Sequence, residues 1–399
     1  MESQKLKDVA LIATGAFTIY SIAKRIYHSV QKKQIEKKKL IDLIGNTPLI
    51  YIESLSKLTG CEIYAKCEFM NPGGSIKDRT CKQIILDAIK QLFHEIEFIG
   101  FFLLLFRDGD LSKEKKYIYE GTSGSTGISL TQLGNSMGFQ TKIFLPDDLA
   151  QEKYLILETM KAKLVKVKPC SIVDSQHYCK LAENQAEVDG AFFSDQFENL
   201  SNFKVHYNST AKEIYTQTHG QIDIFVSGSG TGGTIAGVSR YIKSKKPQVK
   251  VILADPQGSS LRNKVNYGIC YTGEEAEGHR LKHPFDTITE GIGLNRQTDN
   301  FNEAQIDKAF LVTDEEALEM AHFLIQNEGL FLGSSSAVNA CAAVKSARLY
   351  GKGKTIVTVF CDSGMRYLSK FYNPQYLESK GRQYTPKDYS KEFNLDFVL

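Results

Sequence analysis

Short apolar runs alternate with helix-length segments along most of this chain, and this order restricts the fold more than any other feature. The runs with the composition of buried strands lie at 62–70, 115–121, 141–146, 163–168, 222–228, 249–255 and 355–362. Helical patterns separate most of them, as at 150–162 and 314–329. Strands joined by helices form right-handed βαβ units, whose parallel sheets are covered on both faces. The sequence therefore predicts an α/β fold of two lobes, with mainly parallel sheets flanked by helices.

Composition narrows the classes of protein that fit. With 399 residues, of which 42% are hydrophobic, the chain can bury a large core. The net charge is only +3, and seven Lys or Arg lie between 24 and 39, so the basic excess is local and no nucleic-acid partner is predicted. The eight Cys form no CxxC pair, which predicts reduced thiols and no metal site.

The N-terminal segment differs from the rest of the chain. Residues 9–23 are uncharged and are followed by Lys24 and Arg25. As a helix they span about 22 Å, against about 30 Å for the hydrocarbon core of a bilayer. We predict that 1–39 form a short N-terminal membrane-anchor helix and a basic linker, with the remainder in the cytosol. An amphipathic surface helix and a targeting segment are the alternatives.

A second segment interrupts the alternation. Residues 92–106 are strongly apolar and fall between a helical pattern that ends near Lys90 and a polar stretch. The run is too short to span a membrane and has no polar face. Two interpretations remain open: an atypical insertion, including translated non-coding sequence, or an extra packed helix.

Three glycine-rich loops occur where a predicted strand leads into a helix, at the sheet edge where α/β proteins bind ligands. The first, NPGGSIKDR at 71–79, places Lys77 at the start of a helix. A lysine desolvated there is a nucleophilic amine that can form a Schiff base. The alternative is a surface lysine paired with Asp78.

The second loop, EGTSGSTG at 120–127, concentrates hydroxyl and backbone donors at a helix N-terminus, which predicts a carboxylate or phosphate site. The third, SGSGTGGT at 227–234, allows close approach of a phosphate. Taken alone, it also fits a dinucleotide fingerprint of the form GxGxxG, with Asp255 about twenty residues further on.

The three loops together decide between these readings. An NAD oxidoreductase requires neither the lysine nor the hydroxyl-rich loop. A pyridoxal-phosphate enzyme must hold an aldehyde, a phosphate and a substrate carboxylate, and each of the three loops suits one of these groups. The sequence therefore predicts pyridoxal 5'-phosphate as the cofactor.

The motifs NPGGSIKDR, EGTSGSTG, DQFENLSN, GSGTGGT, EGIG and DSGMRYLSKF occur in the order found in cysteine synthases and cystathionine β-synthases. Over residues 40–372 the chain resembles this family of fold-type-II enzymes, whose fold is like that of the tryptophan synthase β-subunit. It is also similar to fungal cysteine-synthase-like proteins of the mitochondrial outer membrane.

The resemblance implies a role for particular residues. Lys77 would be the catalytic lysine, bound to the cofactor and later the acid and base at the α-carbon. The other cofactor-binding residues would be Ser125, Gly230, Thr231, Gly232, Gly233, Thr234 and Ser363. Those that bind the substrate carboxylate would be Thr122, Ser123, Gly124, Thr126 and Gln196. The family usually has Asn in place of Ser125, which leaves the reaction preference open.

The resemblance also implies a reaction and an organisation. The reaction is β-replacement, which forms L-cysteine from O-acetylserine, or a related activated serine, and sulfide or a thiol through an aminoacrylate. The alternatives are cysteine desulfhydration and a non-catalytic membrane-associated homologue. The expected organisation is a homodimer with a mobile subdomain at about 141–185, a C-terminal tail at 373–399, and an anchor in the mitochondrial outer membrane that leaves the catalytic domain facing the cytosol.

Overall fold

The computed structural model describes residues 37–103, 117–170, 172, 174–271, 287–382, 384, 385, 387–389, 391 and 393–399, with side chains omitted for 91–103. It separates 1–39 from a compact unit that comprises 40–399. The predicted anchor helix at 9–23 lies outside the described residues. Among the described helices, none is both long enough and apolar enough to cross a bilayer.

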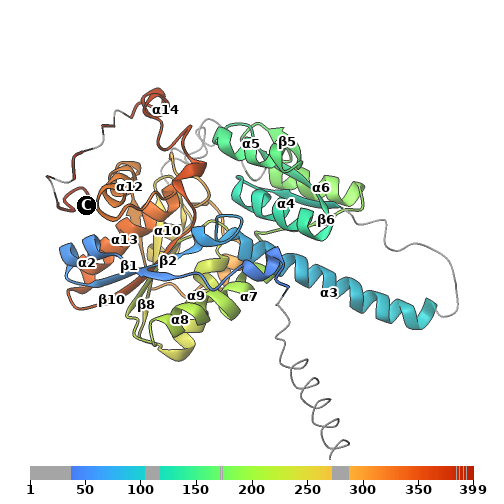
Figure 1. Cartoon of the computed structure of the whole chain (residues 1–399), viewed down its shortest axis with the longest axis horizontal. Helices are drawn as coiled ribbons and strands as arrows, with labels where there is room; N and C mark the ends of the chain where they lie inside the picture. Colours follow the sequence, from blue (N-terminus) through green and yellow to red (C-terminus); the bar gives the residue numbers. More distant parts are fainter. Residues whose placement is uncertain are drawn as a thin grey trace, which may run out of the picture. The chain divides into compact units, whose positions relative to one another are not determined.

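The larger lobe is built on a six-stranded sheet (Figure 1). Its strands, in spatial order, are β1 (Leu49–Tyr51), β2 (Glu62–Cys67), β10 (Thr355–Phe360), β7 (Ile224–Gly228), β8 (Lys250–Pro256) and β9 (Lys308–Val312). Only β1 runs antiparallel to its neighbour among these described strands. One face packs on α2 (Glu53–Thr59), α12 (Asp314–Glu328) and α13 (Ser334–Tyr350). The other packs on α8 (Ala211–Gln217), α9 (Gly233–Lys245) and α10 (Leu261–Tyr267).

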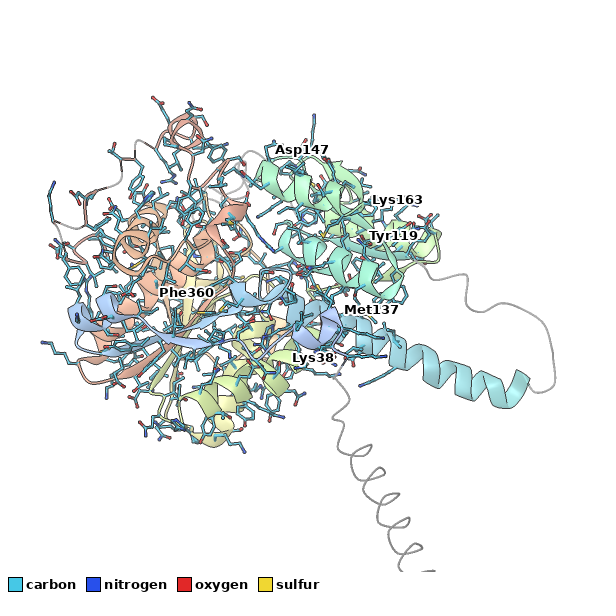
Figure 2. All side chains as sticks on the ribbon, in the orientation of Figure 1. Lys38, Tyr119, Met137, Asp147, Lys163 and Phe360 are labelled. Carbon is cyan, nitrogen blue, oxygen red and sulfur yellow. The ribbon has the colours of Figure 1, made fainter. Side chains whose placement is uncertain are left out.

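The smaller lobe has a four-stranded, fully parallel sheet. Its strands, in spatial order, are β5 (Lys163–Val167), β4 (Gln140–Pro146), β3 (Tyr117–Gly121) and β6 (Phe192–Phe193). Its helices are α4 (Ser125–Met137), α5 (Gln151–Thr159) and α6 (Tyr178–Val188). Figure 2 shows Tyr119 and Lys163 in this lobe and Phe360 in the larger one.

The remaining elements connect or extend the two lobes. They are η1 (Leu40–Leu43), η2 (Glu68–Met70), α3 (Lys77–Leu103), α7 (Ser201–Val205), the π-helix η3 (His206–Thr210), α11 (Asp299–Asn302), η5 (Gly364–Arg366) and α14 (Pro374–Ser379). The C-terminal tail packs on the larger lobe, because Leu377, Tyr389, Leu395 and Val398 are buried in the same core as α12 and α13.

The predicted α/β class with mainly parallel sheets is confirmed, and each predicted strand is present. The sequence did not reveal β1, β6 or β9. Since β1 has three residues and β6 has two, neither is long enough to show a periodicity. The expected helix end near Lys90 is wrong: α3 continues from Lys77 to Leu103, through most of the suspected insertion. No proline interrupts that stretch, so the helix has no reason to stop at Lys90.

Candidate active site

Lys77 is the first residue of α3, after a tight turn that follows β2. In this turn Gly74 has a φ of +76°, a conformation that favours glycine. A Cβ at Gly73 would lie only 2.3 Å from Asp78 Oδ1. The turn is joined to the end of β10, since the Ile76 N–H donates to the Cys361 carbonyl at 3.0 Å and Ser75 forms a β-bridge with Asp362.

The amine of Lys77 makes no hydrogen bond or ion pair with any residue that the structure describes. The alternative pairing with Asp78 is wrong, because that carboxylate accepts from the Gly73 N–H and from Ser129 Oγ, both at 2.5 Å. Burial raises the pKa of Asp78, and these two hydrogen bonds oppose the increase. The lysine is therefore held by its backbone, and its amine remains available for a ligand.

The loop from β7 to α9 brings its backbone close to two other segments. A Cβ at Gly230 would lie 2.3 Å from the Gly291 carbonyl oxygen, and one at Gly233 would lie 2.1 Å from Asn202 Oδ1. Gly232, with a φ of +90°, is the N-cap of the 13-residue helix α9. Because glycine has no side chain, it does not bond the free N–H groups in the first turn of the helix. The buried Ser229 Oγ has no hydrogen-bond partner among the described residues. Free backbone donors and an unpartnered hydroxyl at a helix N-terminus suit a phosphate.

Asn202 and His206 join this loop to the first turn of α3. Thr80 Oγ1 donates to Asn202 Oδ1 at 3.0 Å, and Asn202 Nδ2 donates to Thr231 Oγ1 at 2.7 Å. His206 Nε2 lies 3.4 Å from Thr80 Oγ1 and 3.3 Å from Thr234 Oγ1. Burial, followed by the charges of Arg79 and Lys77, lowers the pKa of His206 well below its usual value, so the imidazole is neutral.

The loop from β3 to α4 forms the second candidate anion site. Thr122 Oγ1 accepts from the Gly124 N–H at 3.1 Å, and Thr126 Oγ1 donates to Gln196 Oε1 at 2.5 Å. Gly124 has a φ of +121°, and a Cβ there would lie 2.6 Å from Lys153 Cδ. The Ser129 bond to Asp78 ties α4 to α3, so this loop and Lys77 are held in one network.

Arg366 connects the first two loops and was not singled out from the sequence, although it lies in the motif DSGMRYLSKF. Its guanidinium donates to the Gly73 carbonyl and, at 3.1 Å, to Ser125 Oγ. The Ser125 hydroxyl in turn donates to Asp362 Oδ2 at 3.4 Å. Ser363 follows Asp362 and caps η5, where its Oγ accepts from the Met365 N–H at 3.3 Å.

The structure thus brings the three loops together through hydrogen bonds and places Gln196 and Ser363 beside them. Asp255, the residue that a dinucleotide reading requires, is fully buried and accepts from the Arg262 N–H at 2.7 Å. Its carboxylate faces the first turn of α10, whose N-cap is Ser260, and is not exposed to a ribose. Sequence reasoning missed Asn202, His206 and Arg366, whose partners are distant in the chain.

Comparison with known proteins agrees with this geometry. The family model for pyridoxal-phosphate dependent enzymes matches residues 40–362. Cysteine synthase 2 of Schizosaccharomyces pombe is 44% identical over 397 residues, which cover 95% of this chain and 96% of the relative. A Saccharomyces cerevisiae relative whose name includes "mitochondrial cysteine synthase" is 45% identical over 378 residues, covering 92% and 91% of the two chains.

Solved structures show the same architecture. The O-acetylserine dependent cystathionine β-synthase of Helicobacter pylori matches with a TM-score of 0.69 at 28% identity, covering 84% of this chain and 99% of that one. An O-ureido-L-serine synthase matches with a TM-score of 0.67 at 26% identity, covering 84% and 94%. On this evidence the chain belongs to the family of pyridoxal-phosphate dependent enzymes.

Proposed function

We propose that this enzyme is a cysteine synthase, which forms L-cysteine from O-acetylserine, or a related activated serine, and sulfide. The observation that carries the proposal is the position of Lys77: its amine has no partner among the described residues, and its neighbours Asp78 and Thr80 bond into the network of two separate anion loops. The names of the relatives at 44% and 45% identity support the same reaction.

The residues present fit the cofactor. Lys77 would hold its carbonyl carbon covalently, and the loop that contains Gly230, Thr231, Gly232, Gly233 and Thr234 would hold its phosphate. Ser363 would pair with its ring nitrogen, and Ser125 would bond its phenolic oxygen. When bound, pyridoxal phosphate supplies an electron sink for the carbanion at the substrate α-carbon.

The protein's own groups would perform the remaining steps. Thr122, Ser123, Gly124, Thr126 and Gln196 would bind the substrate carboxylate, which orients the α-carbon toward Lys77. The freed amine of Lys77 would remove the α-proton, and loss of the β-substituent would leave an acceptor for sulfide. Closure of a subdomain at about 141–185 would exclude water. A contact suited to this closure is the ion pair of the buried Lys153, on α5, with Glu290.

The experiment that tests the function compares two reactions of the purified, cofactor-loaded enzyme. We expect cysteine to form from O-acetylserine and sulfide, and much slower release of sulfide from cysteine alone. Faster sulfide release than cysteine formation would instead identify a desulfhydrase. No turnover of either substrate by protein that carries the cofactor would contradict the proposal.

Replacing Gly233 with alanine tests the phosphate loop. The new Cβ would lie 2.1 Å from Asn202 Oδ1, so Asn202 must move and lose its bonds to Thr80 and Thr231. One unsatisfied buried group costs about 1–3 kcal/mol, so we expect roughly a tenfold to hundredfold weaker affinity for pyridoxal phosphate. Titration of apoenzyme with the cofactor, followed by its absorbance, measures this change.

Gly134→Ala is the matched control, because a Cβ at this position in the last turn of α4 meets Thr141 Cγ2 at an ordinary 3.4 Å. We expect unchanged cofactor affinity and slightly higher stability, since alanine favours a helix over glycine. Equal affinities of the Gly233 and Gly134 variants would argue against the phosphate assignment.

We further propose that residues 1–39 anchor the enzyme in the mitochondrial outer membrane, with 40–372 as the catalytic domain facing the cytosol. We also propose that the enzyme is a homodimer. The uncharged segment at 9–23 and the word "mitochondrial" in the name of one relative support the location. We expect the full chain, but not a chain that lacks 1–39, to remain with mitochondrial membranes after alkaline extraction. Light scattering of the purified enzyme tests the dimer.

A further inference from the structure

Glu120 is the penultimate residue of β3 and the first residue of the sequence EGTSGSTG, which contains Thr122 and Thr126. It is only 1% exposed, and no lysine or arginine in the described part of the chain forms an ion pair with it. The equally buried Glu68 is different, because it pairs with Arg79 at 2.7 Å. A buried carboxyl without a cation is most stable as the neutral acid.

The hydrogen bonds of Glu120 converge on Gln196. Its Oε2 accepts from the Gln196 backbone N–H at 3.2 Å, and its Oε1 accepts from Gln196 Nε2 at 3.3 Å. Gln196 Nε2 also donates to the Gly121 carbonyl at 3.2 Å, and Gln196 Oε1 accepts from Thr126 at 2.5 Å. Glu120 therefore orients the Gln196 amide, which must give up one of these partners when it donates to a substrate carboxylate.

Ser194 is the other hydrogen-bond partner of Glu120. Its hydroxyl donates to Glu120 Oε2 at 2.6 Å and also lies 3.2 Å from the Tyr119 carbonyl, so it is shared between the two acceptors. Burial raises the pKa of Glu120 to about 8, although the bonds with Ser194 and Gln196 act to lower it. The titratable groups coupled to Glu120 on the packed elements are Cys81, Tyr178, Cys179 and Asp195.

We propose that Glu120 is a positioning residue that holds Gln196 and Thr126 for the substrate carboxylate as a neutral acid, and that its ionisation weakens the binding of amino-acid substrates. This inference rests on the proposed function, since it takes Gln196 and Thr126 as carboxylate ligands. The physical reason is repulsion: an ionised Glu120 places a buried negative charge within hydrogen-bond distance of a group that must hold another carboxylate.

Binding of L-serine to the cofactor-loaded enzyme tests this inference, because serine carries the same amino and carboxylate groups as the proposed substrate. Calorimetry on both sides of pH 8, the region in which Glu120 ionises, should show that affinity falls with rising pH in the wild type. Glu120→Gln keeps the shape of the side chain and cannot ionise, so we expect its fall in serine affinity across pH 8 to be roughly tenfold smaller. Ser194→Ala removes a bond that lowers the pKa of Glu120, so the fall should move to higher pH.

Thermal unfolding is a second readout that does not depend on substrate. The pKa of Glu120 is raised to about 8 in the folded chain, against 4.5 for an ordinary glutamate. Between pH 4.5 and 8 the folded chain therefore keeps a proton that the unfolded chain has lost. Stability is therefore lost as pH rises from 4.5 towards 8, and the Tm of the wild type should fall relative to Glu120→Gln over that range.

The outcomes separate this inference from the proposed function. The KM for sulfide, which has no carboxylate, should not depend on Glu120. Identical pH dependence of serine binding in wild type and Glu120→Gln, in an enzyme that makes cysteine, overturns the inference alone. A constant Tm difference across the range also overturns it. Failure of the wild type to bind serine or O-acetylserine at any pH overturns the proposed function, and this inference with it.

Discussion

Lys77→Ala should leave the enzyme without covalently attached cofactor and lower kcat by about a thousandfold or more, because one amine serves both as the attachment point and as the acid and base. The surrounding loops would still bind the phosphate, so some cofactor should remain without a covalent bond. Borohydride reduction followed by peptide mass spectrometry identifies the modified lysine in the wild type. Steady-state kinetics of cysteine formation measures the loss.

Lys82→Ala is the control for this experiment. Lys82 lies on the same helix, but its Nζ donates to the Ile41 carbonyl at 2.9 Å, and Ile41 lies outside the three loops. We expect this variant to keep its covalent cofactor and its activity. A reduced adduct on a lysine other than Lys77 in the wild type would contradict the assignment of the site.

Arg79→Met should lower the free energy of unfolding by about 3–5 kcal/mol, which is the usual cost of leaving a buried charge without its partner. Arg79 is 1% exposed and binds Glu68 at 2.7 Å and Glu213 at 2.6 Å. Glu213 retains Lys66 in the variant, at 2.7 Å, whereas Glu68 loses its cation. Urea unfolding monitored by circular dichroism measures the change.

The same cluster predicts a dependence on pH. Burial alone would raise the pKa of Glu213, but the bonds and charges of Arg79 and Lys66 lower it to about 2, below the ordinary value of 4.5. Stability from this pairing is present above 4.5 and is lost as pH falls towards 2. Arg79→Met should lose less stability than the wild type over this acidic range.

Arg240→Met is the matched control for the buried arginine. Arg240 also pairs with a glutamate, Glu303, at 3.0 Å, but the two side chains are 41% and 37% exposed. Exposed pairs contribute about 0–1 kcal/mol, so this variant should unfold almost as the wild type does. Similar losses for the two variants would show that the charge of Arg79 contributes no more to stability than that of an exposed pair.

The sequence by itself determined the fold class and the positions of the three loops. Short apolar runs, such as 222–228 and 355–362, are enough to predict buried strands. Glycines such as Gly232 indicate turns with a positive φ, a conformation that other residues rarely adopt. Because the carboxyl ends of parallel strands meet at one edge of a sheet, the loops that follow such strands are assigned to ligand binding by their place in the sequence.

Only the tertiary structure decided which groups meet. Asn202 joins Thr80 to Thr231, Arg366 joins Gly73 to Ser125, and Asp78 bonds to Ser129 and not to Lys77. These partners are separated by tens to hundreds of residues, and hydrogen bonds across such separations leave no periodic pattern in the chain. Strand β6 likewise depends on its pairing with β3, because two residues carry too little local preference to specify a strand.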